Sequence, residues 1–103
     1  MTPDSDYPVL RVVDMTFSAS DRKAFLELFA THQGAIAAFP GCGGVVLVER
    51  PAEGGVGFST VSRWQSAAAL DAYRSSALFG VVWPATKRLF LRPPRATSYA
   101  RTM

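Results

Sequence analysis

The sequence predicts an α+β fold whose elements follow in the order β-α-β-β-α-β. β-branched and aromatic residues dominate residues 9–17 and 56–64, whereas apolar residues recur at helical spacing in residues 25–39 and 69–90. Turns rich in glycine or proline separate these stretches. This order is that of the ferredoxin-like fold, in which helices cover one face of a four-stranded antiparallel sheet. The length of 103 residues predicts one domain over the whole chain.

The first strand is predicted over residues 9–17, after an N-terminus (residues 1–7) that is expected to be flexible. A helix of about five turns follows, because Ser18 offers an N-cap hydroxyl and an apolar stripe begins soon after it. The stripe consists of Phe25, Leu28, Phe29, His32, Ile36 and Phe39. Pro40 and the glycines after it are expected to end the helix and reverse the chain.

The second and third strands are predicted over residues 45–48 and 56–64, joined into a hairpin by a turn at 50–55. Ser66 is expected to cap the next helix, in which Ala69, Leu70 and Tyr73 share one face.

A break at residues 75–76 is expected to separate that helix from a further one with its own apolar stripe. The members of this stripe are Leu78, Phe79, Val82, Thr86, Leu89 and Phe90. Pro84 lies inside it and predicts either a kink or the start of a new helix. Residues 92–94 are expected to end the helix, and residues 96–101 to form the fourth strand.

The predicted sheet carries apolar residues on both of its faces. Val12 and Val13 are consecutive, and so are the four apolar residues 45–48. The helices of one chain cover only one face, so a second copy packed sheet to sheet would cover the other. The sequence therefore predicts a homodimer that forms an α/β barrel.

Composition excludes several kinds of site. The single cysteine, Cys42, excludes an intramolecular disulfide, and with the single histidine, His32, it leaves too few N/S ligands for a zinc site, so no metal is expected. No run reaches the roughly 18 apolar residues of a membrane helix, and no secretory signal opens the chain, so a cytoplasmic protein without a membrane partner is expected.

The formal charge of +3 is unevenly distributed, since no acidic residue follows Asp71. The basic residues beyond it are spread out and form no compact cluster. A solvated basic surface without a nucleic-acid partner is therefore expected, while an anion- or nucleic-acid-binding module remains the alternative.

Three stretches resemble the antibiotic biosynthesis monooxygenase (ABM) family of the dimeric α/β-barrel superfamily. They are FPGCGG at residues 39–44, SRWQS at 62–66 and ALDAYRSS at 69–76, the last running on to WPATKRLF at 83–90. The resemblance implies a dimeric barrel. It also implies an enzyme that binds an aromatic or quinol-like phenol between sheet and helices and oxidises it with molecular oxygen, without metal or flavin. A ligand-binding or stress-associated homodimer without turnover is the alternative.

The heme-degrading branch of the superfamily uses an Asn, a Trp and a His that fall near Asp14 (or Val13), on Tyr73 and on Trp83 of this sequence. All three positions differ from that pattern. An indole nitrogen only donates hydrogen bonds and cannot ligate iron. The resemblance therefore implies no heme, and no cofactor is expected.

The aromatic residues Trp64, Tyr73, Phe79 and Trp83 are the candidates for contact with a planar substrate. The alternative is that they fill the core between helices and sheet.

Four polar residues are candidates for the chemistry. His32 is the candidate base, because histidine is the side-chain type whose unperturbed pKa lies near neutrality, with a core or solvent-facing histidine as the alternative. Asp14 is an acid within a strand. It is a candidate to act as a base or to orient a ligand hydroxyl; the alternatives are that it faces solvent or pairs with Arg63 or Arg11 across the sheet. Arg11 and Arg63 are candidates to stabilise an oxyanion, or else form ordinary ion pairs.

Overall fold

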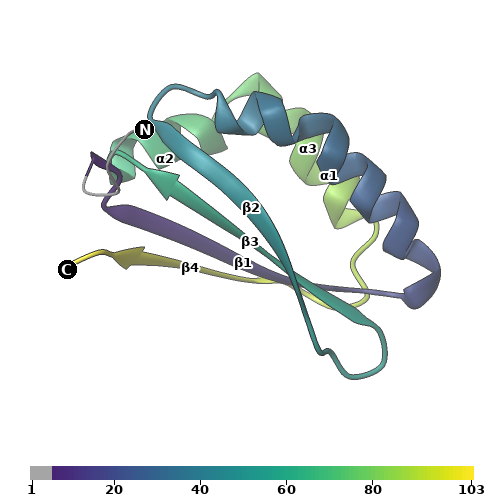
Figure 1. The fold of residues 1–103 in the computed structure, drawn as a ribbon. Helices are drawn as coiled ribbons and strands as arrows, with labels where there is room; N and C mark the ends of the chain where they lie inside the picture. The colour runs from purple at the N-terminus through teal and green to yellow at the C-terminus, as the bar shows by residue number, and fades with distance from the viewer. Residues whose placement is uncertain (1–5) are drawn as a thin grey trace.

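A computed structural model describes residues 6–103 and shows an antiparallel sheet with helices on one face (Figure 1). Its elements are β1 (Val9–Phe17), the short 3-10 helix η2 (Ala19–Asp21), α1 (Arg22–Ala37), β2 (Cys42–Arg50), β3 (Val56–Trp64), α2 (Ala67–Arg74), α3 (Ala77–Lys87) and β4 (Arg95–Ala100). The predicted α+β, ferredoxin-like fold is confirmed. The N-terminus predicted to be flexible falls mostly on residues 1–5, which lie outside the described residues.

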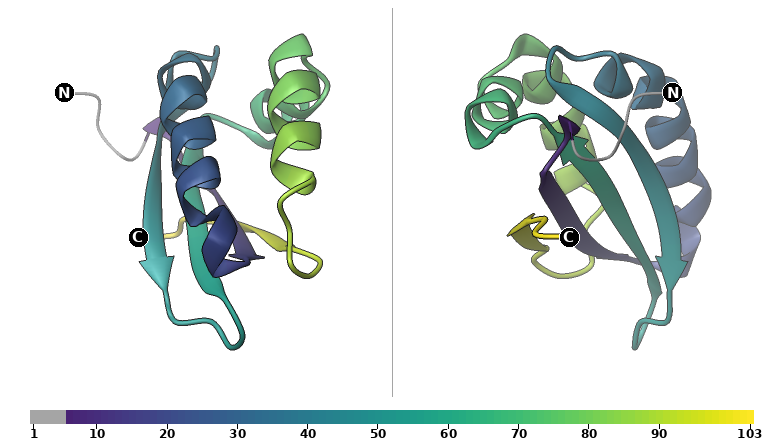
Figure 2. Two further views of the ribbon diagram at one scale, coloured as in Figure 1. Left: turned by 90° about the vertical axis from the view of Figure 1, so that its right-hand side faces the viewer. Right: turned by 60° about the vertical axis from the view of Figure 1, so that its left-hand side comes forward.

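The strands are ordered β2-β3-β1-β4, so β1 lies between β3 and β4. In this register Val13 is opposite Thr60 on one side and Ala96 on the other. Because side chains alternate along a strand, Val13, Met15 and Phe17 face the helices, and Asp14 faces away from them. Figure 2 shows α1 and α3 side by side over the helix-bearing face.

The core is a cluster of aromatic rings between β1, β3 and α1. Phe17 is completely buried, and its ring stacks on that of Phe25 with centroids 4.2 Å apart. Phe58 and Phe90 complete the cluster, with ring centroids 6.3 and 5.7 Å from that of Phe17. This cluster joins the first and third strands, the first helix and the segment after the last helix.

The second strand begins earlier than the sequence predicts. It pairs with β3 from Cys42, with an irregularity between Cys42 and Gly44, although the glycines were expected to form a turn. A Cβ atom at Gly43 would lie 2.5 Å from Cγ of Tyr7, so the absent side chain makes room for the tyrosine ring. Pairing with β3 and this close packing thus outweigh the low strand propensity of glycine.

Not every serine that precedes a helix acts as its N-cap. The side chains of Ser66 and Ser76 accept hydrogen bonds from the backbone N–H groups of Ala69 and Phe79, at 3.1 and 3.2 Å, so the predicted cap at Ser66 is confirmed. Ser18 makes no side-chain cap, because a 3-10 turn intervenes before α1.

The helix ends also differ from the prediction. α1 ends at Ala37, so Phe39 lies beyond it in the turn. α3 continues through Pro84, and the alternative of a new helix starting there is wrong. α3 ends at Lys87, and Phe90 forms an isolated bridge with Phe17 on β1. Packing of the Phe90 ring against the core therefore replaces a last helical turn.

Replacing Phe17 by alanine is expected to lower the free energy of unfolding by about 3–5 kcal/mol, because it leaves a cavity at the centre of the ring cluster. Val81→Ala, at an exposed position of α3, is the control and should change it by less than about 0.5 kcal/mol. Urea unfolding followed by circular dichroism measures both. Equal midpoints for the two variants would contradict the central role of Phe17.

Candidate functional site

A cavity of about 290 Å³ lies between the helix-bearing face of the sheet and the three helices. Its volume is close to the lower end of ligand pockets, roughly 300 Å³. The wall is mostly apolar and draws on all four strands. Its strand residues are Arg11, Val13, Met15, Val45, Thr60, Ser62, Trp64 and Ala96.

Four aromatic side chains on this wall form a continuous series: Trp64, Tyr73, Phe79 and Trp83. The rings of Trp64 and Tyr73 are stacked with centroids 5.1 Å apart, and those of Phe79 and Trp83 with centroids 5.6 Å apart. Tyr73 and Phe79 meet edge to face at 5.3 Å. The structure thus brings together all four predicted substrate-contact residues.

Trp64 also belongs to the core. It is completely buried, and its indole N–H donates to Oγ of Ser62 at 2.9 Å. This hydrogen bond fixes the ring on the sheet and leaves its face toward Tyr73. The two interpretations of the aromatic residues are therefore compatible here, since packed rings form the wall of an open cavity.

Arg11 brings a guanidinium group to the cavity from β1. Its Nη1 donates to Oγ of Ser98 on β4 at 3.0 Å. Burial lowers the pKa of Arg11, and the nearby charge of Arg74 lowers it further. Arg74, which the sequence analysis did not single out, also lines the cavity. Only its position directly after Tyr73 in the helix hinted at this location.

Tyr73 places a phenol in the same cavity. Burial, with a smaller contribution from Cys42, raises the pKa of Tyr73 from 10.0 to about 12. Its hydroxyl therefore stays protonated at neutral pH, which suits a hydrogen-bond donor and not a base.

His32 and Arg63 are not among the residues that line this cavity. His32 is half-buried on α1. Arg63 lies on the other face of the sheet, where Nη2 donates to the carbonyl oxygen of Gly43 at 2.5 Å and the guanidinium lies over the ring of Tyr7, 5.8 Å from its centroid. Arg63 also lines a separate groove of about 400 Å³ beside β2 and α1.

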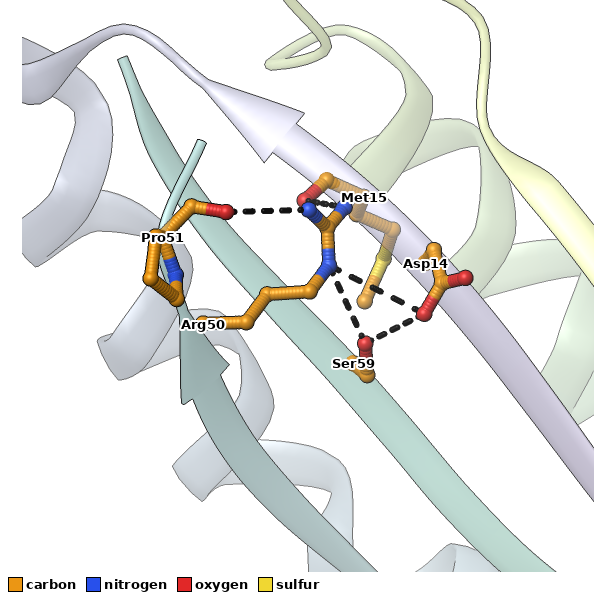
Figure 3. A network of polar contacts seen from close by, with 5 residues as sticks. All are labelled: Asp14, Met15, Arg50, Pro51 and Ser59. Carbon is orange, nitrogen blue, oxygen red and sulfur yellow. Dashed lines mark hydrogen bonds and ion pairs between the residues drawn. The ribbon is translucent and has the colours of Figure 1, made fainter. Parts of the chain in front are cut away.

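Asp14 likewise lies on the face away from the helices, in a polar network that joins three strands (Figure 3). Its carboxylate accepts a hydrogen bond of 2.5 Å from Oγ of Ser59, and Nε of Arg50 lies 3.8 Å from the same oxygen. Arg50 also donates to the carbonyl oxygens of Met15 and Pro51, at 3.1 and 3.4 Å. One of the alternatives was that Asp14 pairs with an arginine across the sheet. It does, but the partner is Arg50 and not Arg11 or Arg63.

Residues 6–103 contain no group of three or more His, Cys, Asp or Glu side chains arranged to hold a metal ion. None of the helices in this range is long and apolar enough to span a membrane.

Comparison with protein-family models gives a match over residues 8–82, to the family described as antibiotic biosynthesis monooxygenase. The matched segment contains Arg11, Trp64, Tyr73, Arg74 and Phe79 and ends just before Trp83. Comparison with curated proteins finds no match.

Solved structures share the fold. A Mycobacterium tuberculosis protein is 25% identical, with 92% of this chain and 95% of that chain covered and a TM-score of 0.81. An antibiotic biosynthesis monooxygenase is 15% identical over 92% of this chain and 99% of that chain, also with a TM-score of 0.81. An anthrone oxidase-like protein is 17% identical, with 100% of this chain and 47% of that chain covered and a TM-score of 0.81.

The phenol of Tyr73 is expected to ionise at about pH 12, because burial disfavours its charged form. The raised pKa means that Tyr73 contributes stability below pH 10 that is lost as the pH rises through 12. The difference in ultraviolet absorbance between the parent and Tyr73→Phe, followed against pH, isolates this phenol. A difference that titrates near pH 10 would show that Tyr73 is not shielded as described.

Proposed function

The chain belongs to the antibiotic biosynthesis monooxygenase family, and from this premise we propose that it oxidises a small phenolic aromatic compound with molecular oxygen. The observation that carries the proposal is the cavity between sheet and helices, whose wall combines six aromatic side chains with the guanidinium groups of Arg11 and Arg74. The likeness to an anthrone oxidase-like protein supports the choice of a fused-ring phenol. The proposal includes no cofactor.

The wall suits a flat substrate of two or three fused rings. Stacked and edge-on aromatic side chains offer both faces and edges to such a ring system. Met15 and Val13 on β1 close the floor with apolar atoms. Little space remains for water beside a bound ring in about 290 Å³.

Charge on the substrate drives the proposed reaction. The guanidinium of Arg11 and the hydroxyl of Tyr73 donate to the phenolic oxygen, which favours its ionised form. The electron-rich anion then reacts directly with oxygen, and a C–O bond forms at the ring carbon opposite the phenolate. Loss of the proton on that carbon, with cleavage of the O–O bond, releases water and leaves a quinone. One oxygen atom enters the product, and the other leaves in water.

The sequence suggested that His32 deprotonates the substrate, whereas here the substrate ionises because Arg11 and Tyr73 stabilise its anion. Arg11 and Tyr73 line the cavity, whereas His32 does not. The guanidinium of Arg11 stabilises the phenolate, so the phenolic proton passes to solvent water and no base on the wall is needed. In this proposal His32 can accept the phenolic proton only after that proton has left the cavity.

The same proposal places the protein in the cytoplasm, where the thiol of Cys42 stays reduced.

The face of the sheet away from the helices supports a homodimer as part of the proposal. Val46, Val48 and Tyr99 are 55%, 47% and 53% exposed on this face. Leu10 and Val12 lie between them on β1. A second copy packed on this face would bury these apolar side chains and close the barrel.

Ala96→Phe is expected to lower kcat/KM by about ten-fold or more, because Ala96 lines the cavity and a larger ring there overfills it. Ala100→Phe is the matched control: this residue lies on the same strand and the same face but not on the cavity wall. Oxygen uptake and quinone absorbance with 1,5-dihydroxynaphthalene measure both. Binding of this phenol without any oxygen uptake would favour the ligand-binding dimer over the enzyme.

The same assay separates His32 from the cavity residues. His32→Ala should retain kcat/KM to within about two-fold, since its side chain does not line the cavity. A loss of more than about ten-fold with unchanged stability would restore His32 as the base.

Val46→Glu is expected to raise the dimer dissociation constant by about 100-fold or more, because each copy would bury an unpaired carboxylate. The side chain is exposed in the single chain, so folding should be little affected. Val81→Glu, exposed on α3, is the control and should leave the dimer intact. Sedimentation velocity gives the result, and a monomeric parent protein would remove the dimer from the proposal.

A further inference from the structure

The cavity carries an unbalanced positive charge. Among the described residues that line it, Arg11 and Arg74 are the only charged ones, and no carboxylate shares the wall with them. The acidic residue next to them, Asp71, lies outside the lining with a side chain that is 73% exposed. It pairs with Arg74 across one helical turn at 4.0 Å, a long separation between exposed groups that contributes little.

The two guanidinium groups act on each other. The charge of Arg74 disfavours the charged form of Arg11, and so does the burial of Arg11, while Asp71 offsets this only in part. Within residues 6–103, the side-chain hydrogen bond of Arg11 goes to an uncharged hydroxyl, that of Ser98. Two cations that share an apolar wall are stabilised by an anion that accepts hydrogen bonds from both.

The arginines also mark one end of the cavity. Arg11 is opposite Ser62 in the strand register, whereas Met15 is opposite Phe58, farther along the sheet. Phe25 and Phe29 line the cavity from α1, and neither carries a polar group. A bound molecule therefore meets positive charge at one end and apolar rings at the other.

We propose that the substrate is a fused-ring phenol with a carboxylate next to its hydroxyl, and that Arg11 and Arg74 together hold these adjacent oxygens. This inference rests on the proposed function, because it names the substrate class of the same site. Two neighbouring oxygens on one ring edge match two guanidinium groups on one wall, which a single hydroxyl does not. The rest of the ring system then lies among the four aromatic side chains.

Binding without oxygen tests the proposal apart from turnover. The probes are 1-hydroxy-2-naphthoate and its methyl ester, which differ in the charge of the acid group and in one methyl group. Both tryptophans of the chain, Trp64 and Trp83, line the cavity, so quenching of tryptophan fluorescence reports binding there. The acid is expected to bind about ten-fold more tightly than the ester, as for a charge-assisted hydrogen bond.

Variants locate the charge. Arg11→Gln and Arg74→Gln should each bring the ratio of the two dissociation constants, ester to acid, close to one. Arg11→Lys should restore part of it, since a charge without the planar fork remains. Arg88→Gln is the matched control, because it removes one positive charge outside the cavity wall, at the end of α3. Its preference should equal that of the parent.

The outcomes separate this inference from the proposed function. Equal binding of acid and ester overturns the inference, and oxygen uptake with an uncharged phenol would leave the proposed function standing. Preference for the acid without oxygen uptake supports the inference and removes the catalytic step. Binding of neither probe overturns the inference, and so does a preference that Arg88→Gln abolishes as completely as Arg11→Gln.

Discussion

The stacking of Phe17 on Phe25 is the contact on which the rest of the structure depends. It joins the end of β1 to the first turns of α1, and Phe58 and Phe90 close around it. One end of the space between sheet and helices is therefore filled by phenylalanine rings. The other end is spanned by α2 and α3, which rest on the sheet through Trp64 and Tyr73. The cavity exists because the filled end sets the separation between the layers.

The positions of the strands were largely predictable, because they depend on local patterns. The strands Val9–Phe17 and Val56–Trp64 agree with the alternation of their side chains, and Ser66 caps its helix as expected. β2 could not be bounded from its sequence. Two glycines follow its first residue, Cys42, and they become a strand only because β3 and the ring of Tyr7 lie beside them. The end of α3 similarly depends on the distant contact between Phe90 and Phe17.

The candidate site shows the same division. The aromatic residues and Arg11 were found because their residue types suit the chemistry and because Arg11 shares a strand face with Met15 and Phe17. That alternation also places Asp14 on the opposite face, where it binds Ser59 and Arg50. The helical stripe that contains His32 does not reveal how far the cavity extends along α1. The sequence did not single out Arg74, because its charge comes close to that of Arg11 only in the folded chain.

The place of β1 at the centre of the sheet bears on how the chain matures during synthesis. β1 is made before β4, its neighbour on one side, and the backbone N–H of Arg101 donates to the carbonyl oxygen of Pro8 at 2.7 Å. Until residues 95–100 have left the ribosome, one side of β1 therefore lacks its strand partner. The cavity wall also lacks Pro94 and Ala96 at that stage. The wall of the cavity is thus complete in a nascent chain only after β4 has left the ribosome and paired with β1.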